Sequence, residues 1–306
     1  MKKILFLLLG IIAAVTANAQ VVEVYENGTL IHIYNNTPAT RYTVKFKAPA
    51  NSETTIDGHD YVEIGGKKWA TMNVGATTVA GSPETAYGDY YAWGEKVTYY
   101  TKVDFNNKDL KSSISWKGTN IEGAHINNNK YQHNWPCYSG TNSFKEWSTA
   151  PYGADGVLNE DCDVAHSSWG SSWRMPTKAD FDNLVKACCG FTSGYSEPAP
   201  DNGTIFTGGV YYIKKAPTTV DGVTYNVPGI LFVDQIDPSK RLFFPAAGNL
   251  QSEKRDGQGS LCTYWSSSKF SVSSSAYCAY YSLVKNTMGM KDNVRCFAFS
   301  IRPVSD

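Results

Sequence analysis

Residues 169–180 read WGSSWRMPTKAD, and this stretch contains the clearest structural signal in the chain. A helix is predicted to begin after Pro176, because Thr177 supplies an N-cap hydroxyl and Asp180 completes a capping box. Gly190 is expected to end this helix. Apolar side chains at helical spacing form one face of it, namely Phe181, Leu184, Val185 and Cys188.

Short strands are predicted on both sides of this helix. Upstream, residues 59–64 and 67–72 flank Gly65-Gly66 as a hairpin, and the aromatic stretch 85–95 is expected to pass through the core. Residues 96–160 lack periodicity and predict a long irregular region, followed by a short helix at 160–168. Further strands are expected at 204–214, 220–225, 229–233, 241–244, 275–285 and 294–304. The pattern indicates an α+β fold that is rich in β-structure and loops.

A small β leader is predicted at residues 20–50, ahead of the main domain. Residues 21–26 and 29–34 alternate as strands do, and Asn27-Gly28 between them is a strong hairpin signal. Another strand is expected at 42–47. Residues 48–55 have the composition of a linker, so the main domain is predicted to span 57–306.

The first 19 residues have the features of a secretory signal peptide. Lys2 and Lys3 precede an apolar run from Ile4 to Val15, and Ala17-Asn18-Ala19 matches the small-residue cleavage pattern. An apolar run of about 12 residues is too short to span a membrane, which requires about 20. We therefore expect an exported protein that is cleaved after Ala19 and has no transmembrane segment in its mature chain.

Composition limits the classes of partner. The chain has 28 Lys and Arg against 28 Asp and Glu, so no basic field is available for nucleic acid. Seven Cys in an exported chain leave at least one unpaired within the chain, and their spacing does not match a structural zinc site. We expect mostly buried thiols, with one or two disulfides whose pairing the sequence does not reveal.

Several strings along the chain have a familiar order. They are KWATMNVG at 68–75, YAWGE at 91–95, AHSSWGSSWRMPT at 165–177, FPAAGN at 244–249, YWSSS at 264–268 and SIRPV at 300–304. Together they resemble the Fibrobacter succinogenes major paralogous domain family, a group of exported proteins of gut and rumen bacteria, over about residues 57–306. The resemblance implies a C-type-lectin-like domain with two helices, a small mixed or antiparallel sheet and long loops held by core Trp residues. It supplies architecture more than function.

No catalytic residues are predicted. The five His residues are scattered, and no G-x-S-x-G string or phosphate-binding glycine loop precedes a helix. The implied fold is shared with formylglycine-generating enzymes, whose relatives would need a reactive Cys pair. Cys262 and Cys278 are the candidates for such a pair, but no neighbouring residue in the sequence is expected to lower their pKa. We therefore expect a protein that is not an enzyme.

No metal or cofactor is predicted either. Lectins of the implied fold bind calcium through Glu-Pro-Asn and Trp-Asn-Asp strings, and Glu197-Pro198-Ala199 matches only in part. Asp201 and Asn202 supply oxygen atoms, but a surface turn explains this stretch equally simply.

A ligand-binding face is predicted near residues 249–285. Trp69, Trp93, Trp169 and Trp173 lie in the familiar strings and are expected in the core, whereas Trp265 precedes a Ser-rich stretch without core periodicity. Such a stretch is typical of an adaptable binding surface and also of an ordinary loop. Residues 264–302 are, in addition, a hypothetical site of sequence diversification. The predicted ligand-binding residues are Asn249, Tyr264, Trp265, Ser267, Lys269 and Tyr281.

The sequence thus predicts an exported recognition or adhesion protein of the cell envelope or surface, with a glycan or protein as its ligand. The alternative is a structural or fimbria-associated subunit whose amino-terminal strands add to a partner's sheet. An enzyme of the formylglycine-generating type ranks third.

Overall fold

The computed structural model describes residues 55–117, 150–190, 209–251, 254–272, 274–285 and 287–306, together with the backbone of the strands at 5–8, 11–14, 21–26, 29–35, 195–196 and 205–206. The chain divides into two compact units, Met1–Ser52 and Glu53–Asp306. The division falls within the stretch 48–55 that the sequence predicts as a linker.

The first unit contains a four-stranded antiparallel sheet in the order β1-β2-β3-β4. Its predicted hairpin is confirmed, because β3 and β4 pair antiparallel with Glu26 opposite Thr29. The strand predicted at 42–47 lies outside the described residues. The strands are β1 (Leu5–Leu8), β2 (Ile11–Ala14), β3 (Val21–Glu26) and β4 (Thr29–Asn35).

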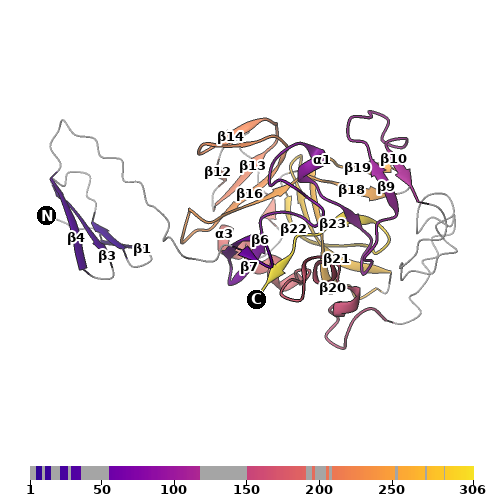
Figure 1. Ribbon diagram of the computed structural model, residues 1–306, viewed down its shortest axis with the longest axis horizontal. Coiled ribbons are helices and arrows are strands. Elements are labelled where there is room, and N and C mark those ends of the chain that lie inside the picture. The colour runs from indigo at the N-terminus through magenta and orange to yellow at the C-terminus, as the bar shows by residue number, and fades with distance from the viewer. Residues whose placement is uncertain are drawn as a thin grey trace. The chain divides into compact units, whose positions relative to one another are not determined.

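The second unit is rich in β-structure, and its described residues include three short helical segments and one longer helix, α3 (Figure 1). The largest sheet has the order β11-β22-β21-β20-β23-β18-β19, with β8 on the far side of β23. It is mixed, since β20 and β23 run parallel. Its strands are β8 (Tyr90–Tyr91), β11 (Tyr195–Ser196), β18 (Asn249–Gln251), β19 (Lys254–Asp256), β20 (Leu261–Lys269), β21 (Ser275–Ser282), β22 (Thr287–Val294) and β23 (Ala298–Ser300).

Two four-stranded sheets and two ribbons complete this unit. One sheet has the order β24-β7-β6-β5, so the end of the chain returns to the first strands of the unit, and the other has the order β12-β13-β16-β17. The bounds are β5 (Thr55–Ile56), β6 (His59–Ile64), β7 (Lys67–Ala70), β9 (Tyr100–Val103), β10 (Ile114–Trp116), β12 (Ile205–Phe206), β13 (Val210–Ile213), β14 (Thr218–Val220), β15 (Val223–Tyr225), β16 (Gly229–Val233), β17 (Arg241–Pro245) and β24 (Val304–Ser305).

The predicted helix is confirmed as α3 (Lys178–Cys189). Thr177 and Asp180 form the capping box, and Gly190 ends the helix in the left-handed conformation that glycine adopts without strain. The helix predicted at 160–168 is divided by Asp163 into a 3-10 turn and a separate helix. The remaining helical segments are α1 (Pro83–Ala86), η2 (Glu160–Cys162) and α2 (Val164–Trp169).

Several strand predictions need correction. The single strand predicted at 204–214 is divided into β12 and β13, which pair antiparallel. The single strand predicted at 220–225 is the hairpin β14–β15, because Asp221 and Gly222 both have positive φ and form a tight turn. The long strand predicted at 294–304 is divided into the last residue of β22, the short strand β23 and the first residue of β24. Residues 266–269 of the Ser-rich stretch after Trp265 belong to strand β20. Strands covered on both faces lack the apolar–polar alternation that marks a half-exposed strand.

Four Trp side chains anchor the core. Trp69, Trp93, Trp173 and Trp265 are fully buried. Each indole N–H donates to a main-chain carbonyl, at Ile64, Ser266, Ile56 and Tyr91 respectively. A buried Trp without such an acceptor would leave its donor unpaired, so these bonds fix where each ring lies.

Arg302 is the most unusual core residue, because its guanidinium is fully buried. Nη1 donates to the carbonyl of Ala70 and Nη2 to that of Phe243, both at 2.9 Å. Nε donates to the side-chain oxygen of Asn73 at 2.9 Å, and the cation lies 4.7 Å from the centre of the Phe244 ring. Burial lowers the pKa of Arg302 to about 10, so the group remains charged at neutral pH.

We expect Arg302→Met to destabilise the protein by about 3–5 kcal/mol, because several buried acceptors lose their donor together. The matched control is Arg241→Met, which breaks a partly exposed ion pair with Asp221 and should cost less than about 1 kcal/mol. Urea unfolding followed by Trp fluorescence measures both. Equal losses in the two variants would contradict a special role for Arg302.

Candidate functional site

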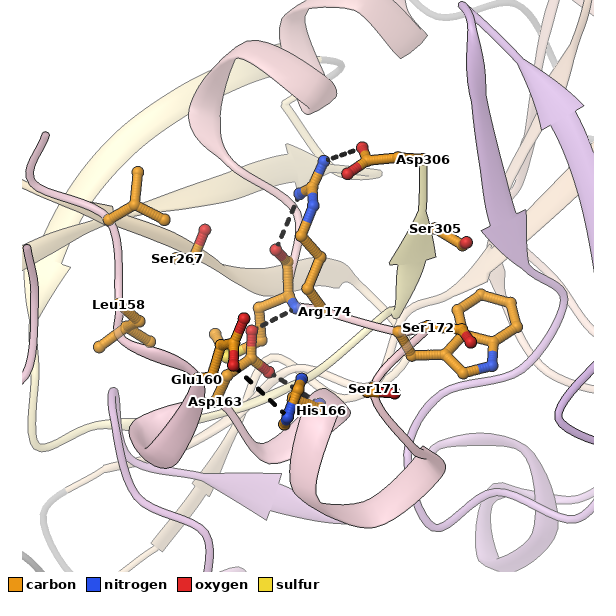
Figure 2. A pocket seen from close by; sticks show the side chains of 13 residues that line it. Leu158, Glu160, Asp163, His166, Ser171, Ser172, Arg174, Ser267, Ser305 and Asp306 are labelled. Carbon is orange, nitrogen blue, oxygen red and sulfur yellow. Dashed lines mark hydrogen bonds and ion pairs between the residues drawn. The ribbon is translucent and has the colours of Figure 1, made fainter.

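A cavity of about 510 Å3 lies between the segment 157–175, strand β20 and residues 305–306 (Figure 2). We call it the Arg174 pocket. It combines hydroxyl, imidazole, carboxylate and guanidinium groups with apolar side chains. It is lined by Val157, Leu158, Glu160, Asp163, His166, Ser171, Ser172, Trp173, Arg174, Met175, Ser267, Ser305 and Asp306.

Asp163 joins the two ends of the segment 163–175, which lines the pocket. Its Oδ1 accepts the backbone N–H groups of Ala165 and His166 at 2.8 and 3.2 Å, which caps helix α2. Its Oδ2 accepts the N–H of Met175 at 2.7 Å, so one carboxylate joins both ends of the segment 163–175. Burial raises the pKa of Asp163, and the donated N–H groups offset part of that rise.

Arg174 reaches across the pocket toward the end of the chain (Figure 2). Its Nη1 donates to Asp180 Oδ2 at 2.7 Å, and its Nη2 donates to Asp306 Oδ1 at 2.7 Å. Asp180 is buried at the start of α3, whereas the Asp306 side chain is 69% exposed. One side of the guanidinium is therefore fixed to the fold, and the other side faces a carboxylate in solvent.

The floor of the pocket presents accessible polar groups. His166 Nε2 lies 4.0 Å from the exposed carboxylate of Glu160. Ser171 and Ser172 are exposed and line the same pocket as His166 (Figure 2). These groups supply hydrogen-bond donors and acceptors with no strong excess of either charge.

An aromatic stack supports the outer side of this loop. His59 from β6 lies parallel to Trp169 with ring centres 3.6 Å apart, and Trp173 meets Trp169 edge-on at 5.5 Å. Trp169 is half-buried, so the expectation of a core position holds in full for Trp69, Trp93 and Trp173 and only in part for Trp169.

The structure corrects most of the predicted ligand-binding set. Tyr264, Trp265 and Tyr281 are fully buried, which leaves no ring face for a ligand to stack on. Tyr264 donates to the carbonyl of Pro245 at 2.7 Å, and Trp265 stacks on Phe299 at 4.2 Å. These residues pack the core of the large sheet.

The other predicted residues divide between the core and the surface. Asn249 is buried in β18 and pairs with β19 and β23. Ser267 lines the Arg174 pocket, but its hydroxyl is itself buried and has no hydrogen-bond partner among the described residues. Lys269 is exposed, and its ammonium lies 4.8 Å from the ring of Tyr152. The six residues therefore do not form one site.

The stretch 264–302 consists largely of core strands. Its exposed positions are few, so any diversification would be confined to them. They include Lys269, Ser271, Val272, Val284, Lys285, Lys291 and Asp292.

The Arg174 pocket was missed as a site at the sequence level, because its residues come from segments far apart in the chain. The only signal was the WGSSWRMPT string, which indicated structure rather than binding. The Glu197-Pro198-Ala199 turn, with Asp201 and Asn202, lies outside the described residues. Among those that are described, no group of three or more His, Cys, Asp or Glu is placed to hold a metal ion.

The cysteines are arranged as buried thiols. Within the described part of the chain, Cys296 is disulfide-bonded and five cysteines are buried free thiols, namely Cys162, Cys188, Cys189, Cys262 and Cys278. Burial raises the pKa of Cys262 and of Cys278 well above the usual range. Cys278 pairs with Trp265, three residues from Cys262 along β20, so the two thiols project from opposite faces of the sheet. They cannot form the reactive pair considered from the sequence.

Comparison with known proteins adds no relative to this geometry. No family model, curated protein or solved structure matches the chain. The Arg174 pocket is therefore the main evidence on function.

We expect the five free thiols to resist alkylation in the folded protein, because burial suppresses the thiolate that reacts. Iodoacetamide treatment at neutral pH followed by mass spectrometry should show no labelling of Cys262 or Cys278, and full labelling after unfolding in urea. Rapid labelling of either thiol in the folded protein would restore the reactive-cysteine interpretation.

Proposed function

We propose that this chain is an exported recognition or adhesion protein of the bacterial cell envelope or surface, which binds a glycan in the Arg174 pocket. The observation that carries the proposal is the pocket of about 510 Å3 lined by accessible hydroxyl, imidazole and carboxylate groups. A volume in this range suits a small ligand.

The chemistry of the lining favours a hydroxyl-rich ligand. Ser171, Ser172 and His166 can each donate or accept a hydrogen bond, and Glu160 accepts only. Val157 and Leu158 add apolar surface beside them. A sugar presents hydroxyl groups around its edge and C–H groups on its faces, which matches such a mixed lining.

The same geometry favours binding over catalysis. A serine nucleophile needs a hydrogen-bonded base. In the described part of the chain, no hydrogen bond joins His166 to a serine hydroxyl, and Asp163 is occupied by three backbone N–H groups. We therefore propose recognition without a reaction.

Three features support a C-type-lectin-like architecture for the second unit. It contains the helices α2 and α3, a mixed sheet, and buried Trp side chains whose indole N–H groups donate to strand carbonyls. This is the arrangement that the resemblance of the sequence strings implies. The fold by itself does not specify the ligand.

Export is supported by the amino-terminal sequence. The basic start, the apolar run and Ala17-Asn18-Ala19 favour cleavage after Ala19. Within the part of the chain that the structure describes, there is no helix with the length and apolarity needed to cross a membrane.

A glycan-array screen of the purified protein, with calcium and again with a chelator, tests the proposal. We expect selective binding that His166→Ala and Ser171→Ala each weaken by about tenfold, the effect of losing one or two hydrogen bonds. Calorimetry with the selected glycan measures this loss.

Ser168→Ala is the matched control, because Ser168 is exposed at the end of α2 and does not line the pocket. Its affinity should equal that of the wild type. A silent array, or glycan binding that neither pocket variant changes, would overturn the proposed site.

A structural subunit is the second candidate, and one observation favours it. Strand β3 pairs with β2, which lies within the predicted signal peptide. Cleavage after Ala19 would remove β2 and leave one edge of β3 unpaired, and a strand from a partner can add to such an edge.

Assembly of the processed protein distinguishes the two candidates. If the protein is a recognition protein, we expect residues 20–306 to remain monomeric in analytical ultracentrifugation. Ordered oligomers that are abolished by Val24→Pro, which blocks strand pairing, would favour the structural subunit instead.

A further inference from the structure

Three cationic side chains converge on Asp306 at the rim of the Arg174 pocket. Arg174 Nη2 and Lys67 Nζ both contact Asp306 Oδ1, at 2.7 and 2.5 Å. Lys68 Nζ donates to the main-chain oxygen of Asp306 at 3.1 Å. The hydrogen bonds from Arg174 and Lys67 hold the pKa of Asp306 well below its usual range.

This cluster differs from the ion pair on the other side of Arg174. Asp180 is buried, belongs to the capping box of α3 and is held by Thr177 as well as by Arg174. Asp306 is 69% exposed and lies one residue beyond β24. Solvent screens ion pairs of an exposed carboxylate, so an incoming carboxylate can reach the two cations and exchange with Asp306.

Both cations come from fixed backbone positions. Lys67 belongs to β7 and pairs with Ile64 across the β6–β7 hairpin, and Arg174 has a second carboxylate partner, Asp180, whose bond does not involve Asp306. Removing Asp306 from its position would therefore leave a preformed carboxylate site next to the hydroxyl groups of the pocket.

We propose that Asp306 occupies an anion site in which the cations of Arg174 and Lys67 recognise the carboxylate of an acidic sugar, such as a uronic acid. The inference rests on the proposed function and names the class of glycan. The Asp306 carboxylate competes with the ligand for the two cations. It pairs with Arg174 and Lys67 when no ligand is bound, and the carboxylate of an acidic ligand replaces it.

The test compares a trisaccharide of galacturonate with a neutral trisaccharide of the same length, by calorimetry at low ionic strength. Asp306→Asn removes the competing charge and should tighten binding of the acidic sugar by about fivefold or more, the factor that matches an exposed ion pair. The neutral sugar should gain clearly less affinity than the acidic sugar of the same length. Raising the salt to about 0.15 M should reduce the gain.

Asp221→Asn is the matched control. Asp221 also forms a partly exposed ion pair with an arginine, Arg241, and its positive φ is one that Asn tolerates. It removes the same charge outside the pocket and should leave both affinities unchanged. Adding Lys67→Met to Asp306→Asn should cancel the gain, because it removes one of the two cations.

Several outcomes would overturn the inference. They are no gain in Asp306→Asn, an equal gain in Asp221→Asn, an equal gain for the neutral sugar, or no binding of the acidic sugar by any variant. If neutral glycans bind and respond to His166→Ala while Asp306→Asn has no effect, the inference fails and the proposed function stands. A silent array together with no acidic binding rejects both.

Discussion

A buried positive charge without an acidic partner in the described part of the chain is the constraint on which the second unit depends. Arg302 satisfies its guanidinium with the carbonyls of Ala70 and Phe243 and with the side chain of Asn73. These acceptors belong to β7, to the segment that follows it, and to β17, which lie in different sheets. A charged group in the core is tolerated only when all these acceptors are in place, so the bonds of Arg302 enforce one relative arrangement of the sheets.

The same principle positions the Arg174 pocket. Asp163 accepts three backbone N–H groups at its base, and Asp180 fixes Arg174 from the start of α3. Between these carboxylates, helix α2 is followed by a short irregular stretch that carries Ser171 and Ser172, and buried hydrogen bonds to Asp163 fix the segment at both ends. A site supported in this way can present polar groups in a constant geometry before a ligand arrives, which lowers the entropic cost of binding.

The strand β20 explains why the sequence predicted exposed ligand-binding residues at positions that are buried in the sheet. Residues 264–268 read YWSSS, and their polarity and lack of alternation suggested an exposed loop. In the sheet, β20 is flanked by β21 and β23 and covered on both faces, and Ser266 satisfies its hydroxyl with the carbonyl of Tyr277. Small polar side chains fit a crowded interior when the backbone supplies a partner, and composition alone does not distinguish that case from solvent exposure.

Local chemistry in the sequence was enough to determine several elements of this protein. The helix α3 with both of its caps, the hairpins at Asn27-Gly28 and Gly65-Gly66, and the β-rich class follow from interactions between residues close in the chain. The Asp221-Gly222 turn carried the same kind of signal and was overlooked. Only the tertiary structure decided that Trp265 lies in the core and that Cys262 and Cys278 face opposite sides of a sheet. Only the tertiary structure placed Asp306 next to Arg174 and Lys67. Such contacts depend on the order of the strands and on which sheet faces are covered. Packing between segments distant in sequence decides both.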